Sequence, residues 1–146
     1  MIWPPMTDID DEIRATAEAA RGARDRAYAP YSRFPMGAAL TTDEGEIIVG
    51  VLVENVSLGL AMCAERVALF SAVTQQQRPV VLALCSKRTE DELTFPCGAC
   101  LQVALEIGGP DLVVVATDPE GNLDHATVGE LLTRAPKRHS PRHAAT

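Results

Sequence analysis

Apolar residues recur along the chain at two spacings, one typical of amphipathic helices and the other of buried strands. Near the start of the chain they fall three or four positions apart, which predicts a helix from Thr7 to Ala27. Pro30 and Pro35 follow this helix, and proline lacks the backbone N–H that a helix needs. Residues 28–35 are therefore expected to form an ordered loop.

The rest of the pattern predicts five strands and three further helices. The strands are expected at residues 37–42, 46–51, 80–85, 112–117 and 122–125. The helices are expected at residues 63–77, 95–107 and 127–132. Asp43-Glu44-Gly45 separates the first two strands and has the residues of a hairpin turn, so this pair should be antiparallel. The order of elements predicts an α/β fold of three layers, α/β/α, in which helices cover both faces of one central mixed five-stranded sheet.

Composition agrees with a single compact domain, because the 146 residues are 47% hydrophobic and 23% charged. The formal net charge is -7, and basic residues cluster only near the C-terminus, at Arg134, Lys137, Arg138 and Arg142. A protein that binds duplex nucleic acid needs a basic surface, so we expect no nucleic-acid partner. We also expect no membrane association and a cytoplasmic location, because the sequence shows neither a membrane-spanning apolar run nor a secretion signal.

The chemistry of the chain is concentrated at its cysteines. Cys63, Cys97 and Cys100 can fill three corners of a tetrahedral zinc site and leave the fourth for water, which is typical of a catalytic site. If Cys63 and Cys97 each begin a helix, their thiolates face positive helix ends, which lowers the thiol pKa and favours metal binding. Glu65 lies two residues after Cys63 and is a candidate to take a proton and return it to a substrate.

The cysteine pattern is also compatible with a site that has no catalytic role. A C-x-x-C pair alone more often marks a structural zinc site or a redox pair. A closed structural site would need Cys85, which lies within a predicted strand and is better explained as a small buried apolar residue. Glu65 after Cys63, together with Pro96 before Cys97, instead fits the pattern of zinc deaminases, whose glutamate is not a metal ligand.

From about Ala27 to Leu132 the chain resembles the small homotetrameric cytidine deaminases. The matching motifs are Ala29–Phe34 with Gly37–Leu40, Val53-Glu54-Asn55, Cys63–Arg66, and Pro96–Cys100 with Gln102-Val103. The resemblance implies a zinc-dependent hydrolase that converts cytidine or deoxycytidine to the uridine form and releases ammonia, in pyrimidine salvage. It also implies one zinc ion per subunit, a homotetramer and a catalytic domain over residues 1–132, and we expect residues 133–146 to form a mobile tail.

The resemblance also implies a role for individual residues. Cys63, Cys97 and Cys100 would hold the zinc, and Glu65 would be the catalytic proton carrier. Arg66 would donate a hydrogen bond to a zinc thiolate and so reduce its negative charge. The substrate would contact Phe34, Glu54 through a ribose hydroxyl, and the backbone of Ala64 through the pyrimidine carbonyl.

The sequence departs from the family at positions expected in the substrate pocket. Leu52 stands where an asparagine usually binds the ribose, and Leu58 where a tyrosine is usual. Leu101 replaces a second arginine near the zinc, and Pro136 lies in the segment that usually supplies an aromatic cover for the base. A sugar hydroxyl without its usual partner costs roughly 1–3 kcal/mol, so the sugar-binding part of the pocket is expected to differ.

Two alternatives follow from these departures. One is a deaminase of a modified or sugar-poor aminopyrimidine, or of a nucleoside of the blasticidin S type. The other is a non-catalytic, zinc-stabilised assembly protein, which the presence of Glu65 at the expected position disfavours.

Overall fold

The computed structural model describes residues 8–137, and in this part of the chain five strands form one mixed sheet with helices on both faces. The elements are α1 (Ile9–Arg24), β1 (Gly37–Thr42), β2 (Ile47–Val51), the short 3-10 helix η1 (Leu58–Leu60), α2 (Ala64–Thr74), β3 (Pro79–Cys85), α3 (Gly98–Gly108), β4 (Val113–Thr117), β5 (Leu123–Thr127) and α4 (Val128–Leu131). The strand order is β2-β1-β3-β4-β5. Strands β3 and β4 are parallel, and the other neighbouring pairs are antiparallel. The predicted fold class is confirmed.

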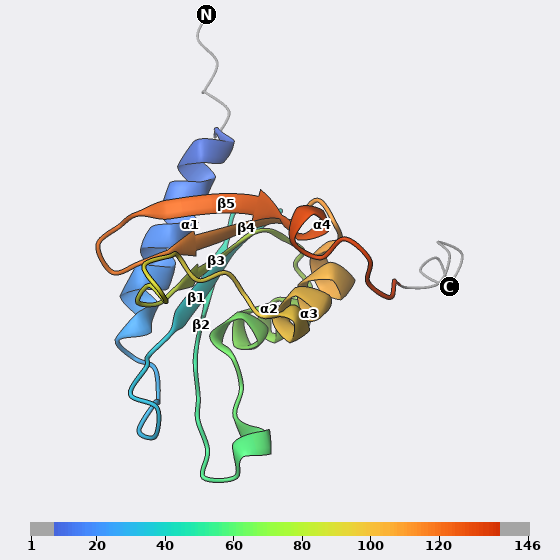
Figure 1. Ribbon diagram of the computed structural model, residues 1–146. Helices are drawn as coiled ribbons and strands as arrows, with labels where there is room; N and C mark the ends of the chain where they lie inside the picture. Colours follow the sequence, from blue (N-terminus) through green and yellow to red (C-terminus); the bar gives the residue numbers. More distant parts are fainter. Residues whose placement is uncertain (1–7, 138–146) are drawn as a thin grey trace, which may run out of the picture.

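The sheet separates two hydrophobic cores, because successive side chains of a strand point to opposite faces. Figure 1 shows α1 on one face and the pair α2 and α3 on the other. On the α1 side, Ala17 and Ala20 pack against Val81, Ala83 and Cys85 of β3. Leu82, the β3 residue between Val81 and Ala83, belongs to the opposite core with side chains of α2 and α3. The prediction that Cys85 is a buried apolar residue is confirmed, since it is 0% exposed and burial raises its pKa to about 11.

Helix α1 lies so close to the sheet that one position of β1 tolerates no side chain. A Cβ atom on Gly37 would lie 2.4 Å from the backbone nitrogen of Arg24. The glycine at the start of β1 therefore fixes the end of α1 against the sheet, just before the loop that was predicted at residues 28–35.

The predicted boundaries differ from the observed ones mainly at element ends. The first helix ends at Arg24, three residues earlier than predicted, and α4 is only four residues long. Helix η1 was not predicted, because it is short and its leucines are almost fully exposed. Among the described residues, no helix is both long and apolar enough to span a bilayer.

The tail predicted from residue 133 lies partly outside the described residues, which end at 137. Within the described part, the carbonyl of Pro136 accepts a hydrogen bond from Nε2 of Gln102 at 2.9 Å. Ala135 packs against the core that contains α3. Residues 133–137 therefore contact the helix that begins with Gly98.

Candidate metal centre and active site

The three cysteines predicted as ligands lie together where α2 and α3 begin. Strands β2 and β3 both run antiparallel to β1, so the C-terminal ends of both strands lie at the same end of the sheet. Each is followed by a helix on the same face, α2 after β2 and α3 after β3. Cys63 is the N-cap of α2 and Cys97 is the N-cap of α3, while Cys100 lies in the first turn of α3. The prediction that two of the cysteines each begin a helix is confirmed.

The thiol groups are spaced for one metal ion. The Sγ atoms of Cys63, Cys97 and Cys100 all lie within 4.8 Å of one another. Three sulfurs in a tetrahedral zinc site lie about 3.8 Å apart, given a zinc–sulfur distance of about 2.3 Å. Cys85 faces the α1 side of the sheet and does not join this group. Within residues 8–137 the cluster therefore offers three ligands and leaves one tetrahedral position open.

The local charges also fit a divalent cation. Burial alone would raise the pKa of Cys97, but interactions with the backbone N–H groups of Cys100 and Ala99 at the start of α3 hold it below its ordinary value. Burial, and then the charges of Glu65 and Cys63, raise the pKa of Cys100. Several acidic groups thus compete for protons in a small volume, and a metal cation that binds thiolates would displace those protons.

Arg66 supplies a positive charge beside the cluster. Its Nη2 atom donates a hydrogen bond to Sγ of Cys63 at 3.3 Å, and this bond, followed by one to Cys100, raises the pKa of Arg66. The predicted contact between Arg66 and a thiolate is present in the structure. Leu101, where a second arginine was expected, is 6% exposed and packs in the core shared by α2 and α3. It contributes no donor to the sulfurs.

Glu65 is buried next to the cysteines. Glu65 is 3% exposed. Burial raises its pKa above the ordinary value of a glutamate, although Cys100 and Arg66 lower the pKa by smaller amounts. A carboxyl group with a raised pKa takes up a proton more readily than an ordinary glutamate does. The residue therefore has the burial and the location that a proton carrier requires.

Four of the predicted substrate residues lie at the start of α2 or in segments connected to Met62, the residue before Cys63, through backbone pairing. Ala64 is the first residue of α2 and is buried, and Phe34 is half-buried in the loop before β1. Leu52 is half-buried, and its backbone bonds to Met36 and Tyr28 of that loop. Glu54 accepts hydrogen bonds from the backbone N–H groups of Tyr31 and Ser32. Sequence reasoning did not identify these two partners.

Leu58 is placed differently from the other predicted substrate residues. It lies in η1, which protrudes from the rest of the chain in Figure 1, and its residue is 82% exposed. One chain alone does not enclose it.

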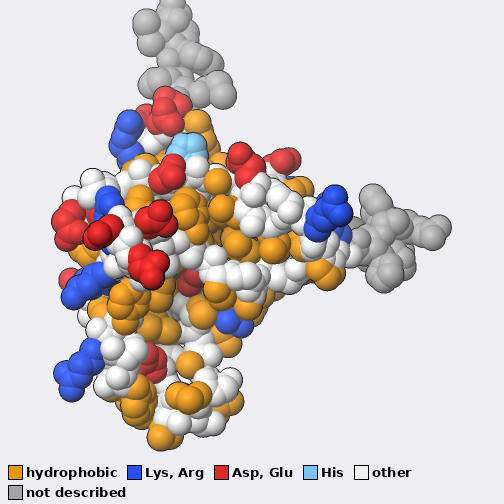
Figure 2. All heavy atoms as spheres, in the orientation of Figure 1, with side chains coloured by type: hydrophobic (Ala, Val, Ile, Leu, Met, Phe, Trp, Pro, Cys, Tyr) orange, Lys and Arg blue, Asp and Glu red, His pale blue; other side chains and the backbone are white. Residues whose placement is uncertain are grey.

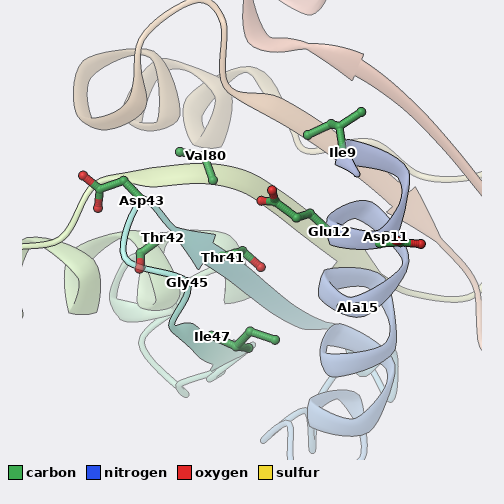
Figure 3. Close-up of a pocket in the computed structure, with 10 residues that line it drawn as sticks. All are labelled: Ile9, Asp11, Glu12, Ala15, Thr41, Thr42, Asp43, Gly45, Ile47 and Val80. Carbon is green, nitrogen blue, oxygen red and sulfur yellow. The ribbon is translucent and has the colours of Figure 1, made fainter. Parts of the chain in front are cut away.

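A separate cavity of about 690 Å³ lies on the α1 side of the sheet, as Figure 3 shows. It is lined by Ile9, Asp11, Glu12, Ala15, Thr41, Thr42, Asp43, Gly45, Ile47 and Val80. These residues come from the first half of α1, the end of β1, the turn to β2, the start of β2 and the start of β3. The cysteines lie beyond the C-terminal ends of β2 and β3, whereas the cavity lies at the N-terminal ends of these strands. The cavity is therefore not part of the candidate metal centre.

Comparison with known proteins agrees with the geometry of the site. The family described as "Cytidine and deoxycytidylate deaminase zinc-binding region" matches residues 10–117. A cytidine deaminase of Halalkalibacterium halodurans is 44% identical over 113 residues, which cover 77% of this chain and 85% of that protein. A cytidine deaminase of Sporosarcina psychrophila is 37% identical over 134 residues, covering 92% of this chain and 98% of that protein.

Solved structures give the same result. The crystal structure of a cytidine deaminase from Burkholderia pseudomallei superposes with a TM-score of 0.78 at 45% identity, covering 83% of this chain and 96% of that chain. A blasticidin-S deaminase of Bacillus cereus is also similar, at 30% identity over 108 residues, 69% of this chain and 76% of that protein. These three cytidine deaminases are thus more similar to this chain than the blasticidin-S deaminase is.

Proposed function

The chain belongs to the cytidine and deoxycytidylate deaminase family, and on that premise we propose which of its residues carry out a zinc-dependent hydrolytic deamination. The reaction converts cytidine and water to uridine and ammonia. The observation that carries this function is the cluster of Cys63, Cys97 and Cys100 with the buried Glu65 beside it. The protein is an enzyme, and a merely structural zinc site would need no acid at this position.

The three cysteines hold one zinc ion, and their fit rests on the spacing of their sulfurs, two helix N-termini and the charge of Arg66. When bound, zinc supplies a Lewis acid that makes water a nucleophile near neutral pH. Because the thiols must stay reduced to bind metal, we place the enzyme in the cytoplasm. Pyrimidine salvage is the metabolic role that fits this reaction.

Glu65 moves the protons of the reaction. Its carboxylate takes a proton from the attacking water and delivers it to the ring nitrogen of the pyrimidine, and a second transfer lets the amino group leave as ammonia. Burial raises its pKa, which favours the protonated form that must exist between these transfers. The raised pKa and the position next to the ligand cysteines support this role.

Substrate contacts are assigned by position. The backbone at Ala64 meets the pyrimidine carbonyl, Phe34 lies against the base and Glu54 binds a ribose hydroxyl. Leu52 and Leu58 give the sugar side of the pocket an apolar surface, so this enzyme binds the ribose with fewer hydrogen bonds. The similarity to cytidine deaminases at up to 44–45% identity favours cytidine or deoxycytidine over blasticidin S.

The enzyme works as a homo-oligomer, and we expect a tetramer. Figure 2 shows hydrophobic side chains gathered over the protruding segment that carries η1. Val56, Leu58 and Leu60 are 79%, 82% and 70% exposed, and Phe70 and Val73 of α2 are also exposed. Apolar surface of this kind marks contact sites between proteins. Light scattering coupled to size-exclusion chromatography tests this, and a monomer would contradict it.

The test of the function is ammonia release by zinc-loaded protein, with cytidine, deoxycytidine, cytosine and blasticidin S as substrates. We expect turnover of cytidine or deoxycytidine at about 1–10³ per second. Release from blasticidin S alone would overturn the substrate assignment. No release from any of these compounds by protein that holds one zinc per chain would overturn the enzymatic function.

A further inference from the structure

Two loops that border the candidate active site are joined by backbone pairing. Tyr28 forms a parallel bridge with Val53, and Val53 forms an antiparallel bridge with Met62. The N–H of Glu54 donates to the carbonyl of Tyr28 at 2.8 Å. Met62 directly precedes the ligand Cys63, so the loop of residues 28–36, the segment around Glu54 and the start of α2 form one connected unit.

The Glu54 carboxylate adds a side-chain clamp to this unit. Its Oε1 atom accepts hydrogen bonds from the N–H of Tyr31 at 3.0 Å and the N–H of Ser32 at 3.2 Å. Hydrogen bonding from the Ser32 side chain, and then from the two backbone N–H groups, lowers the pKa of Glu54 despite the opposing effect of desolvation. The carboxylate is therefore charged near neutral pH and binds the loop in that form.

The side chain of Ser32 in turn binds the backbone of Phe34. The Oγ atom of Ser32 accepts a hydrogen bond from the N–H of Phe34 at 3.0 Å. Arg33, between them, has φ of 55°, a left-handed conformation that costs a residue with a side chain roughly 1–2 kcal/mol. A loop with such a residue keeps its shape only when its neighbours are fixed, and Glu54 and Ser32 fix both sides of Arg33.

We propose that Glu54 and Ser32 are positioning residues for Phe34: Glu54 holds the loop of residues 28–36 through Ser32 and so sets where the Phe34 ring meets the substrate. The kinetic consequence rests on the proposed function, whereas the clamp itself does not. On this proposal Glu54 acts on the substrate through Ser32 and Phe34 as well as through any contact of its own. On the same proposal, Ser32 makes no contact with the substrate and acts only through Phe34.

The clamp is tested by amide hydrogen exchange of the full-length, zinc-loaded protein without substrate. Glu54→Ala should speed exchange at Tyr31 and Ser32, and Ser32→Ala should speed it at Phe34, each by about three- to tenfold. Glu54→Gln keeps an oxygen acceptor, so exchange at Tyr31 should stay within about twofold of the parent protein. Ser71→Ala is the matched control, because Ser71 donates only within α2, to the carbonyl of Val67. Unchanged exchange in both alanine variants would overturn the clamp.

The kinetic test uses Ser32 because it is not among the substrate contacts proposed above. Ser32→Ala should raise KM for cytidine about two- to tenfold and change kcat less than twofold, and Ser32→Thr, which retains the hydroxyl, should restore KM. An unchanged KM in Ser32→Ala with altered exchange would overturn the link from the loop to the substrate. If the parent protein releases no ammonia, the proposed function fails, and the exchange rates still decide whether the clamp exists.

Discussion

Arg66 donates a hydrogen bond from Nη2 to Sγ of Cys63, 3.3 Å away and one helical turn earlier. Leu101 supplies no second side-chain donor from α3, so within residues 8–137 the reduction of the negative charge on Cys63 and Cys100 by a cationic side chain falls to Arg66. Arg66→Gln should therefore weaken zinc binding about 10- to 100-fold. Zinc competition with a chromophoric chelator measures the affinity.

Arg14→Gln is the control for this change, because Arg14 is exposed and pairs with Asp11 of its own helix at 3.4 Å. It should leave zinc affinity unchanged. Equal affinity in Arg66→Gln and the parent protein would show that Arg66 has no part in holding the metal.

Glu65→Gln should lower kcat about 10²- to 10⁴-fold, because a side-chain amide neither takes up nor releases a proton near neutral pH. Zinc content should remain at one ion per chain, since Glu65 is outside the group of three thiols. Ammonia release and atomic emission on the same preparation check both statements. A kcat within tenfold of the parent value would contradict the proton-carrier role.

Removal of the metal should stop the reaction and destabilise the fold. A ligand that binds only the folded state adds about 2.7 kcal/mol when its free concentration is a hundredfold above Kd. Thermal unfolding with chelator and with added zinc measures this difference. Cys97→Ala should lose the stabilisation by zinc. Cys85→Ala should keep one zinc per chain, because Cys85 lies on the α1 side of the sheet. Loss of zinc from Cys85→Ala would contradict the ligand assignment.

Asp118 should make stability depend on pH. It is fully buried, and Arg88 and Asn122 donate to its carboxylate at 3.0 Å and 2.9 Å. Burial would raise its pKa, but hydrogen bonds from Asn122 and Arg88 outweigh burial and hold it below the ordinary value. The unfolded chain then binds the proton first as pH falls, so the stabilisation is complete above about pH 4 and is lost as pH falls through the folded-state pKa.

Asp118→Asn should lower the free energy of unfolding by about 1–3 kcal/mol at pH 7, and the gap to the parent protein should narrow below about pH 4. Urea unfolding of the zinc-loaded proteins between pH 7 and about pH 4 or below measures the free energy of unfolding of both proteins. Asp25→Asn is the control, because the Asp25 side chain is 87% exposed. A gap that stays constant with pH would show that Asp118 does not titrate in this way.

Leu52→Asn should lower KM for cytidine about two- to tenfold, because it returns a hydrogen-bonding side chain to the sugar side of the pocket. Steady-state kinetics with cytidine and with cytosine, which has no sugar, separate this effect from a general one. An equal change for both compounds would place Leu52 away from the ribose.

The cysteines show how far sequence reasoning reached. Helix-forming residues after Cys63 predict one helix, and a second helix is predicted to open around Cys97; both cysteines are N-caps. Cys85 was separated from them by its place in an apolar run, and the alternation of β3 puts it on the other face. Local patterns of this kind were enough to predict the fold and the cysteines of the metal cluster.

The contacts of Glu54 could not be predicted in the same way. They join residues more than twenty positions apart, and they lie in a loop whose Arg33 has a left-handed conformation, for which an arginine gives no signal. The bond from Gln102 to the Pro136 carbonyl is another long-range contact without a local pattern. The roles of Phe34, Leu52 and Leu58 toward substrate stay predictions.

The parallel pairing of β3 with β4 also bears on the order in which the protein assembles. The ligand cysteines come from the chain on both sides of β3, at the starts of the two helical crossovers that β3 separates. Pairing of β3 with β1 brings the starts of α2 and α3 to the same end of the sheet, and the cysteines with them. We therefore expect zinc capture to be a late step of folding, after the long-range strand pairing that limits the folding rate of such topologies. In this respect the protein differs from small zinc modules, in which the metal nucleates the fold.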